Sequence, residues 1–144
     1  EMKQSILIES EKDFYIDNLY TGSWLGNRDN TLLTYDCTFK DCYIVANYTN
    51  AQITNCVFIN CMFSWELFDN AKYVGCTFVD CSFEYLVMYK SVFKDCKFYS
   101  CDFTEVTANS CEFYECSLHS CIMDDMDYST SSLLNTESDF INHV

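Results

Sequence analysis

The sequence predicts an all-β solenoid, a coil of four short sides that stacks on itself every twenty residues. Two observations lead to this prediction. Cysteines stand five residues apart in pairs, and the pairs recur every twenty residues. A large apolar residue, most often phenylalanine, follows nearly every cysteine by two positions. The two cysteine series are Cys56, Cys76, Cys96 and Cys116, and Cys61, Cys81, Cys101 and Cys121.

Neither an α-helix nor a single β-strand keeps residues five apart on one face. Residues five apart drift around an α-helix, and alternation along a strand sends every second five-residue unit to the opposite side. A coil with five-residue sides has two inward positions per side: a large central residue and a small one two places before it. Residues twenty apart then stack at the strand separation of about 4.8 Å. Phe58, Phe78 and Phe98 form one such predicted column.

The elements follow in chain order. Residues 1–36 are expected to form an N-terminal cap, whose last five residues are a degenerate first unit, because the open end of a stacked repeat must be covered. Residues 37–128 form the repeat, about four to five coils, of which the first is one residue short. On the third side Glu66 occupies a small inward position, and we expect a bulge that turns its carboxylate to solvent. In residues 129–144 the leucines and Phe140 share one face of a short C-terminal helix, which caps the coil or forms a dimer.

All eleven cysteines occupy the small inward position, so we predict that they are reduced core residues. Their odd number excludes a complete disulfide framework, and stacked, parallel thiols do not have the geometry of a disulfide. Zinc would need four ligands that converge on one point. Disulfides or a metal cluster are the alternatives; no metal or cofactor is expected. Unpaired thiols favour a reducing, cytoplasmic compartment.

Within this pattern, the units that begin at Cys76, Cys81, Cys96 and Cys101 resemble the pentapeptide-repeat family, whose unit is a small residue, a polar one, then Leu or Phe and two variable ones. The resemblance covers residues 37–128 and implies a right-handed quadrilateral β-helix. Members of the family have many functions, so the resemblance implies no single one.

Composition excludes several classes of function. A net charge of −14 and a pI near 4.1 argue against direct nucleic-acid binding. No apolar run is long enough to insert into a membrane. An enzyme is not expected, because His119 points outward and inward cysteines cannot act as nucleophiles. The cluster Asp124, Asp125 and Asp127 lacks the spacing of a calcium-binding EF-hand loop.

The leading hypothesis is a rigid, non-enzymatic scaffold that binds another protein through an acidic and aromatic face. As alternatives, the acidic residues only keep the protein soluble, and the exposed aromatic residues only pack against neighbouring strands. The candidate surface residues are Trp65, Tyr85, Tyr99, Tyr114, Glu105, Glu112, Glu115, Asp124 and Asp125.

Two narrower functions come from resemblance. Some acidic pentapeptide-repeat rods mimic DNA and bind DNA gyrase, a type II topoisomerase. In such a protein the C-terminal segment of this chain would form the interface of a homodimer. The segments that begin at Phe39, Asn55 and Leu67 are also similar, in their order, to segments of the luminal domain of the synaptic vesicle glycoprotein two family, a receptor for neurotoxins. In that case the chain would be luminal or extracellular, and the sequon Asn47-Tyr48-Thr49 would carry an N-glycan at Asn47.

Overall fold

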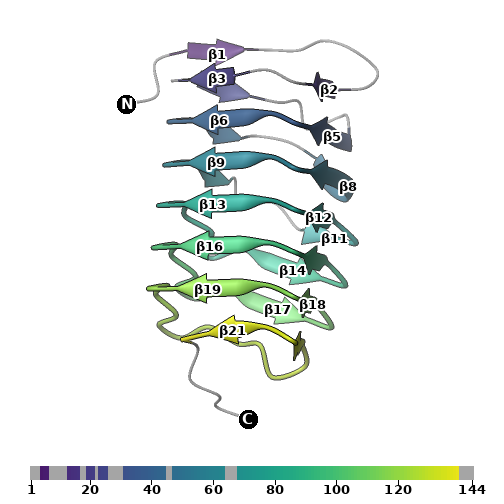
Figure 1. The fold of residues 1–144 in the computed structure, drawn as a ribbon, viewed down its shortest axis with the longest axis vertical. Helices are drawn as coiled ribbons and strands as arrows, with labels where there is room; N and C mark the ends of the chain where they lie inside the picture. The colour runs from purple at the N-terminus through teal and green to yellow at the C-terminus, as the bar shows by residue number, and fades with distance from the viewer. Residues whose placement is uncertain are drawn as a thin grey trace.

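The computed structural model is a stack of short parallel strands arranged in four sheets (Figure 1). It describes residues 4–6, 13–16, 19–21, 23–25, 31–44, 47–63 and 68–139. Each sheet is formed by strands from one side of successive coils, and we number the sides from Cys56: residues 56–60 belong to the first side and residues 71–75 to the fourth. The all-β solenoid predicted from the sequence is confirmed. Among the described residues there is no helix of the length and apolarity needed to span a membrane.

The first and fourth sides carry the two longest sheets. The first-side strands are β3 (Leu19–Thr21), β6 (Thr38–Lys40), β9 (Val57–Ile59), β13 (Thr77–Val79), β16 (Lys97–Tyr99), β19 (Ser117–His119) and β21 (Glu137–Ser138). The fourth-side strands are β2 (Asp13–Ile16), β5 (Thr31–Tyr35), β8 (Asn47–Thr54), β12 (Lys72–Val74), β15 (Val92–Lys94), β18 (Glu112–Tyr114) and β20 (Ser132–Leu134).

The second and third sides have shorter sheets. The second-side strands are β1 (Gln4–Ile6), β4 (Ser23–Leu25), β7 (Tyr43–Ile44) and β10 (Met62–Phe63). After β10 this side continues as single parallel bridges, which pair Met62 with Ser82, Ser82 with Asp102, and Asp102 with Ile122. The third-side strands are β11 (Phe68–Asp69), β14 (Val87–Tyr89) and β17 (Thr107–Asn109).

The register shows where the coil changes length. Val57 pairs with Thr77, a step of twenty residues, whereas Thr38 pairs with Val57, a step of nineteen. The short first coil expected from the sequence is therefore present. On the fourth side Leu33 pairs with Gln52, again a step of nineteen, and the pairing of β5 with β8 is irregular between Thr31 and Leu33. The step of nineteen continues before residue 31, where β1 pairs with β4. This part of the sequence lacks the cysteine period, and its described strands nevertheless extend the stack.

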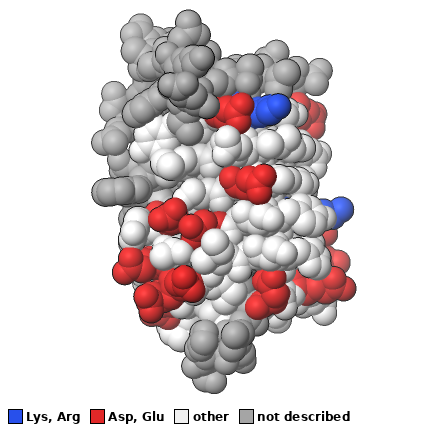
Figure 2. Space-filling model, turned by 90° about the vertical axis from the view of Figure 1, so that its left-hand side faces the viewer, with Lys and Arg blue, Asp and Glu red and all other residues white. Residues whose placement is uncertain are grey.

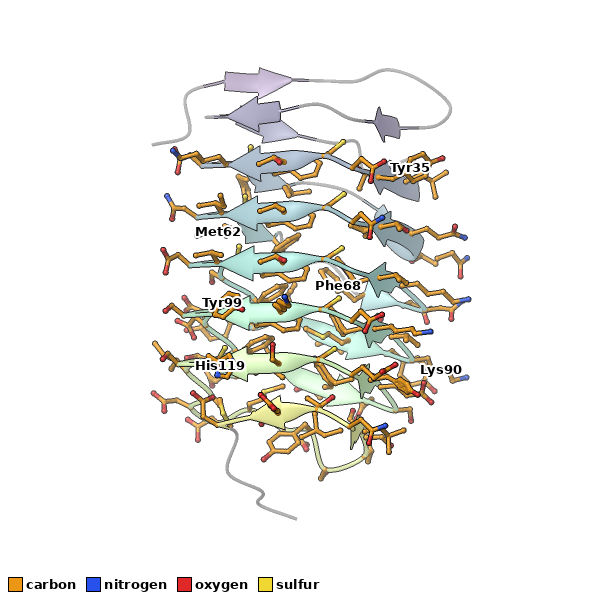
Figure 3. All side chains as sticks on the ribbon, viewed as in Figure 1. Tyr35, Met62, Phe68, Lys90, Tyr99 and His119 are labelled. Carbon is orange, nitrogen blue, oxygen red and sulfur yellow. The ribbon has the colours of Figure 1, made fainter. Side chains whose placement is uncertain are left out.

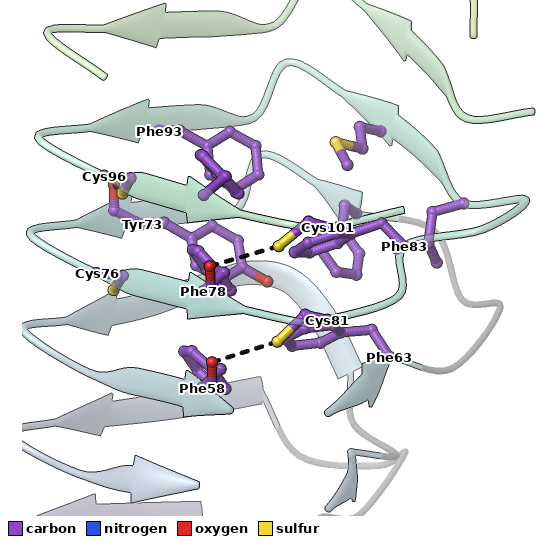
Figure 4. Close-up of a cluster of buried hydrophobic side chains, with 14 of the residues drawn as sticks. Phe58, Phe63, Tyr73, Cys76, Phe78, Cys81, Phe83, Phe93, Cys96 and Cys101 are labelled. Carbon is purple, nitrogen blue, oxygen red and sulfur yellow. Dashed lines mark hydrogen bonds between the residues drawn. The ribbon is translucent and has the colours of Figure 1, made fainter. Parts of the chain in front are cut away.

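Aromatic rings fill the centre of the coil in continuous columns (Figure 4). Phe58, Phe78 and Phe98 are fully buried on the first side, with ring centroids 5.0 and 4.8 Å apart and nearly parallel planes. Rings of adjacent sides meet edge to face, as Phe78 and Phe83 do with centroids 5.4 Å apart. Both arrangements are favourable for aromatic pairs. The predicted core column is confirmed, and the ring spacing measures the rise of one coil.

The corners explain how the chain turns with three glycines and no proline. The last residue of almost every described unit has a positive φ, between 46° and 66°. Asn and Asp adopt this left-handed conformation more readily than other non-glycine residues, and they occupy most of these corners in the N-terminal half of the repeat. Their side chains also bond along the axis: the Asn70 amide donates to Asn50 Oδ1 at 2.8 Å.

The third side has a different inward residue for a local reason. At its start, hydrogen bonds from Leu86 N to Phe83 O and from Val106 N to Phe103 O, both 3.1 Å, close four-residue turns. The larger residues Leu86 and Val106 follow these turns and are fully buried beside the smaller Ala108. Val106 is large where Ala108, the central residue of the same unit, is small, so these two residues compensate each other in packing. Glu66 and its expected bulge lie outside the described residues.

The predicted C-terminal helix is wrong over the described residues. Residues 131–135 form another five-residue unit, in which Leu133 pairs with Phe113 and Asn135 takes the positive-φ corner. β21 then pairs with β19 on the first side. The two leucines suggested a helical face, but in a strand they point in opposite directions: Leu133 is partly buried against the core and Leu134 is 52% exposed.

We predict that Phe78→Ala lowers the free energy of unfolding by about 3–5 kcal/mol, because Phe78 stacks on a ring above and a ring below and its loss leaves a cavity. Denaturant titration followed by circular dichroism measures the change. Val87→Ala is the control, since Val87 lies on the same coil and is 44% exposed; its effect should stay within about 0.5 kcal/mol. Equal losses in the two variants would contradict the stacked core.

Candidate interaction face and cysteine ladders

The second side of the coil gathers acidic side chains without a compensating cation. Its carboxylates are Glu84, Asp102, Glu105, Asp124 and Asp125, and the described residues of this side include no lysine or arginine. Figure 2 shows the left-hand side of Figure 1, where acidic groups are numerous in the middle and lower parts and basic groups appear in the upper part and at the right-hand edge. We call residues 81–85, 101–105 and 121–125 of the second side, together with Met62, the acidic face.

The backbone fixes these carboxylates. Glu105 and Asp125 are the positive-φ residues of the tight turns that end this side, with φ of 54° and 56°, as the third residue of a type II turn requires. Asp102 Oδ1 accepts hydrogen bonds from the Thr104 backbone N–H at 2.9 Å and from its hydroxyl at 2.6 Å. The Glu105 N–H donates to Asp124 O at 2.8 Å, which keeps the two coils in register. Glu105 and Asp125 are therefore axial neighbours in one column, and the other acidic groups of this side share the same rigid support.

Apolar side chains lie among the carboxylates. Met62, Tyr85 and Ile122 are 44%, 48% and 50% exposed, among the most exposed large apolar residues that the structure describes. A shallow hollow of about 150 Å³ is lined by Met62, Phe63, Ser82, Glu84 and Tyr85. Small-molecule pockets are usually about 300–1,000 Å³, so this hollow suits a single side chain of a partner better than a ligand.

The structure distributes the predicted surface residues over three sides. Tyr85, Glu105, Asp124 and Asp125 lie on the acidic face, whereas Tyr99 is on the first side and Glu112, Tyr114 and Glu115 belong to the fourth. Trp65 lies outside the described residues. Asn47 begins β8, and its side chain also lies outside them. Glu84, Met62 and Ile122 were not among the predicted surface residues, although their five-residue register assigns them to the column positions of the acidic face.

The aromatic residues off the acidic face pack on their neighbours. Tyr99 and His119 stack along the first side, with centroids 5.8 Å apart (Figure 3). The Lys94 ammonium lies 5.7 Å from the Tyr114 ring centroid. Packing between strands accounts for these contacts.

No cluster of three or more His, Cys, Asp or Glu side chains with metal-binding geometry occurs in the part of the chain that the structure describes. Asp124 and Asp125 face along the second side, whereas Asp127 accepts hydrogen bonds from the Ser129 backbone and hydroxyl on the third. These bonds lower the pKa of Asp127. The three aspartates therefore do not converge.

The cysteines point inward as predicted, and none forms a disulfide. Ten are buried and Cys121, in the last complete coil, is partly exposed. Each described thiol donates to main-chain carbonyls: Cys81 Sγ lies 3.3 Å from Phe58 O, and Cys101 Sγ lies 3.4 Å from Phe78 O (Figure 4). Burial raises the pKa of the Cys56 thiol from 9.0 to about 12 and also raises the pKa of Cys111.

With this geometry in place, comparison with solved structures identifies the fold. The pentapeptide repeat protein Rfr23 from the cyanobacterium Cyanothece 51142 superimposes with a TM-score of 0.54 at 9% identity, over 90% of this chain and 88% of that one. The chain has the pentapeptide-repeat fold. This confirms, at the level of fold, the resemblance noted in the sequence.

Two structures of QnrB1, a plasmid-mediated fluoroquinolone resistance protein, also match. The full-length form gives a TM-score of 0.45 at 13% identity, over 88% of this chain and 93% of that one. A trypsin-treated form gives 0.46 at 19% identity, over 85% of this chain and 54% of that one. No protein-family model matches the sequence, and the search of curated proteins found no match.

We predict that the free energy of unfolding falls as the pH rises from about 9 to about 12. The unfolded Cys56 thiol loses its proton near pH 9, whereas the folded thiol keeps it until about pH 12, so in this window the unfolded state binds fewer protons. The stabilisation is complete below pH 9 and is lost above it, at up to about 1.4 kcal/mol per pH unit for each such thiol.

The measurement is unfolding stability against pH for the wild type and for Cys56→Ala. Alanine already occupies the equivalent small inward position at Ala51 and Ala71, which are fully buried, so the variant should fold. The free energy of unfolding of this variant should fall less steeply with pH than that of the wild type, by an amount that corresponds to at most one bound proton. Tyrosine and lysine ionisation affects both proteins alike. Identical slopes would show that Cys56 ionises equally in both states.

Proposed function

We propose that this chain is a non-enzymatic scaffold that binds another protein through its acidic face. The observation that supports the proposal most directly is the coincidence, on one rigid side, of uncompensated carboxylates with exposed Met62, Tyr85 and Ile122. Apolar anchors surrounded by charge are typical of protein interfaces. A partner with a basic surface and a protruding apolar side chain would complement both features.

The rigidity of the coil favours this use. The backbone hydrogen bonds along the axis of this face, such as Tyr85 N to Thr104 O at 3.0 Å, hold each row in place. A preorganised surface loses little conformational entropy on binding. Electrostatic complementarity would then raise the association rate and make binding sensitive to salt.

The extent of the face favours a protein partner over a narrower role as a DNA mimic of a topoisomerase. Its carboxylates occupy three successive coils, from Glu84 to Asp125. Two steps of about 4.8 Å span less than 10 Å, or about three base pairs at 3.4 Å each. This length is short for a substitute for duplex DNA but is sufficient for the charged part of a protein interface.

We predict that Glu105→Lys with Asp125→Lys weakens binding at least tenfold, because two adjacent carboxylates of the proposed contact become cations. The matched control is Glu112→Lys with Glu115→Lys, which makes the same charge change at exposed residues on the fourth side. Affinity capture from the source cell with wild type and both variants would select candidate partners that only the first variant loses.

Direct binding of the purified candidate then decides the outcome. The dissociation constant should rise with ionic strength for the wild type, and the fourth-side variant should behave like the wild type. Equal binding by the two double variants, in a candidate that binds the wild type, would place the interface on another side and contradict the proposal.

A further inference from the structure

Sulfur is segregated in the core of the coil. Small inward residues form three columns in the described repeat, and cysteine takes every position of two of them from residue 37 to residue 121. The first column is Cys37, Cys56, Cys76, Cys96 and Cys116, and the second is Cys42, Cys61, Cys81, Cys101 and Cys121. The third column, at the start of the fourth side, holds Ala51, Ala71, Ser91, Cys111 and Ser131. The small inward position therefore accepts residues other than cysteine.

The thiols of each cysteine column are parallel and one coil apart. In both Cys81 and Cys101 the Sγ atom lies within 3.5 Å of the carbonyl two residues before it and of a carbonyl one coil earlier. The same orientation places the sulfur atoms above one another (Figure 4). Adjacent rings of the neighbouring column, Phe83 and Phe103, have centroids 5.0 Å apart, so the step between successive sulfur atoms is close to this value.

We propose that these cysteine ladders bind soft cations that take two sulfur ligands in a line, namely monovalent copper or silver or divalent mercury, between successive thiols. Thiolate ligands favour such soft ions. If these bonds are similar in length to the zinc–sulfur bond of about 2.3 Å, two of them span about 4.6 Å, close to the step of the ladder. Zinc, which needs four converging ligands, does not fit a column of parallel thiols.

The binding step is an exchange of protons for metal. Two S–H bonds break, two S–metal bonds form, and two protons pass to solvent; no atom changes its oxidation state. With divalent mercury the two-thiolate complex is neutral, whereas a monovalent ion leaves one negative charge. Burial disfavours that charge, so the monovalent ions should bind best where a rung of the ladder is near solvent.

One end of the second ladder is accessible. Cys121 is the one cysteine that is not fully buried, and the Cys101 thiol lies one coil beneath it. Its contacts are also the longest of the ladder: Cys121 Sγ lies 3.8 Å from Phe98 O and 3.6 Å from His119 O. The pair Cys101–Cys121 is therefore the site that loads first.

The test is titration of the reduced, full-length chain with Hg²⁺ and with Ag⁺ under anaerobic conditions. Thiolate–metal charge-transfer absorbance and native mass spectrometry report the uptake, and a pH-stat reports the protons released. We expect the first Hg²⁺ to release two protons per ion. X-ray absorption should show two sulfur ligands at about 2.3 Å.

Cys121→Ser and Cys101→Ser should each weaken the first site by more than the 10–100-fold that is typical of losing an outer-shell partner. Cys111→Ser is the matched control and should leave uptake unchanged. Cys111 is buried like Cys101, but Ser91 and Ser131 flank it along its column, and the Ser131 hydroxyl accepts a hydrogen bond from its N–H at 3.0 Å.

A readout on the wild type avoids dependence on the folding of variants. One equivalent of metal should protect Cys121 from alkylation, with the modified site located by mass spectrometry. Uptake that occurs only after unfolding, equal losses in Cys111→Ser and Cys121→Ser, or one proton released per ion would each overturn the proposal and leave the ladders as packing alone.

Discussion

The hydrogen-bonded step between parallel strands determines the rest of this structure. Each coil bonds to the next through main-chain groups, as Thr77 N does to Cys56 O at 2.9 Å and Lys97 N does to Cys76 O at 2.9 Å. Every residue therefore lies one strand separation from its equivalents above and below. The spacing suits aromatic rings, which stack at 4.7–5.0 Å in the central columns. The same spacing forces whatever stands in any other column, whether sulfur, amide or carboxylate, into a regular row.

This constraint explains why the inward half of the fold could be predicted from the sequence. A central residue must be large and its neighbour two places earlier must be small, so Phe78 and Cys76 recur as Phe98 and Cys96. The corners were harder to recognise, because residues as different as Asn70, Tyr85 and Lys90 all adopt a positive φ there. Hydrogen bonds of the flanking coils hold these residues in a conformation that they do not favour on their own.

The errors came from segments without cysteine. Residues 131–135 follow the rule of the repeat, with Ser131 and Leu133 at the inward positions and Asn135 at the corner. The adjacent leucines outweighed that pattern and suggested a helix. The candidate surface residues are spread over three sides for a different reason. Acidic residues were grouped by their order in the chain, which joins Glu105 to Glu112, whereas a solenoid brings together residues one coil apart, such as Glu105 and Asp125.

The same regular step has an electrostatic consequence on the acidic face. Two like charges about 4.8 Å apart repel each other by about 1 kcal/mol even at the dielectric constant of water. The described residues of this face offer no lysine or arginine to relieve that repulsion. The buried columns hold the coils together regardless of what the outer rows carry, so the repulsion persists in the folded chain. A cationic partner would remove it on binding, so in the proposed function the unfavourable spacing of the carboxylates would contribute to recognition.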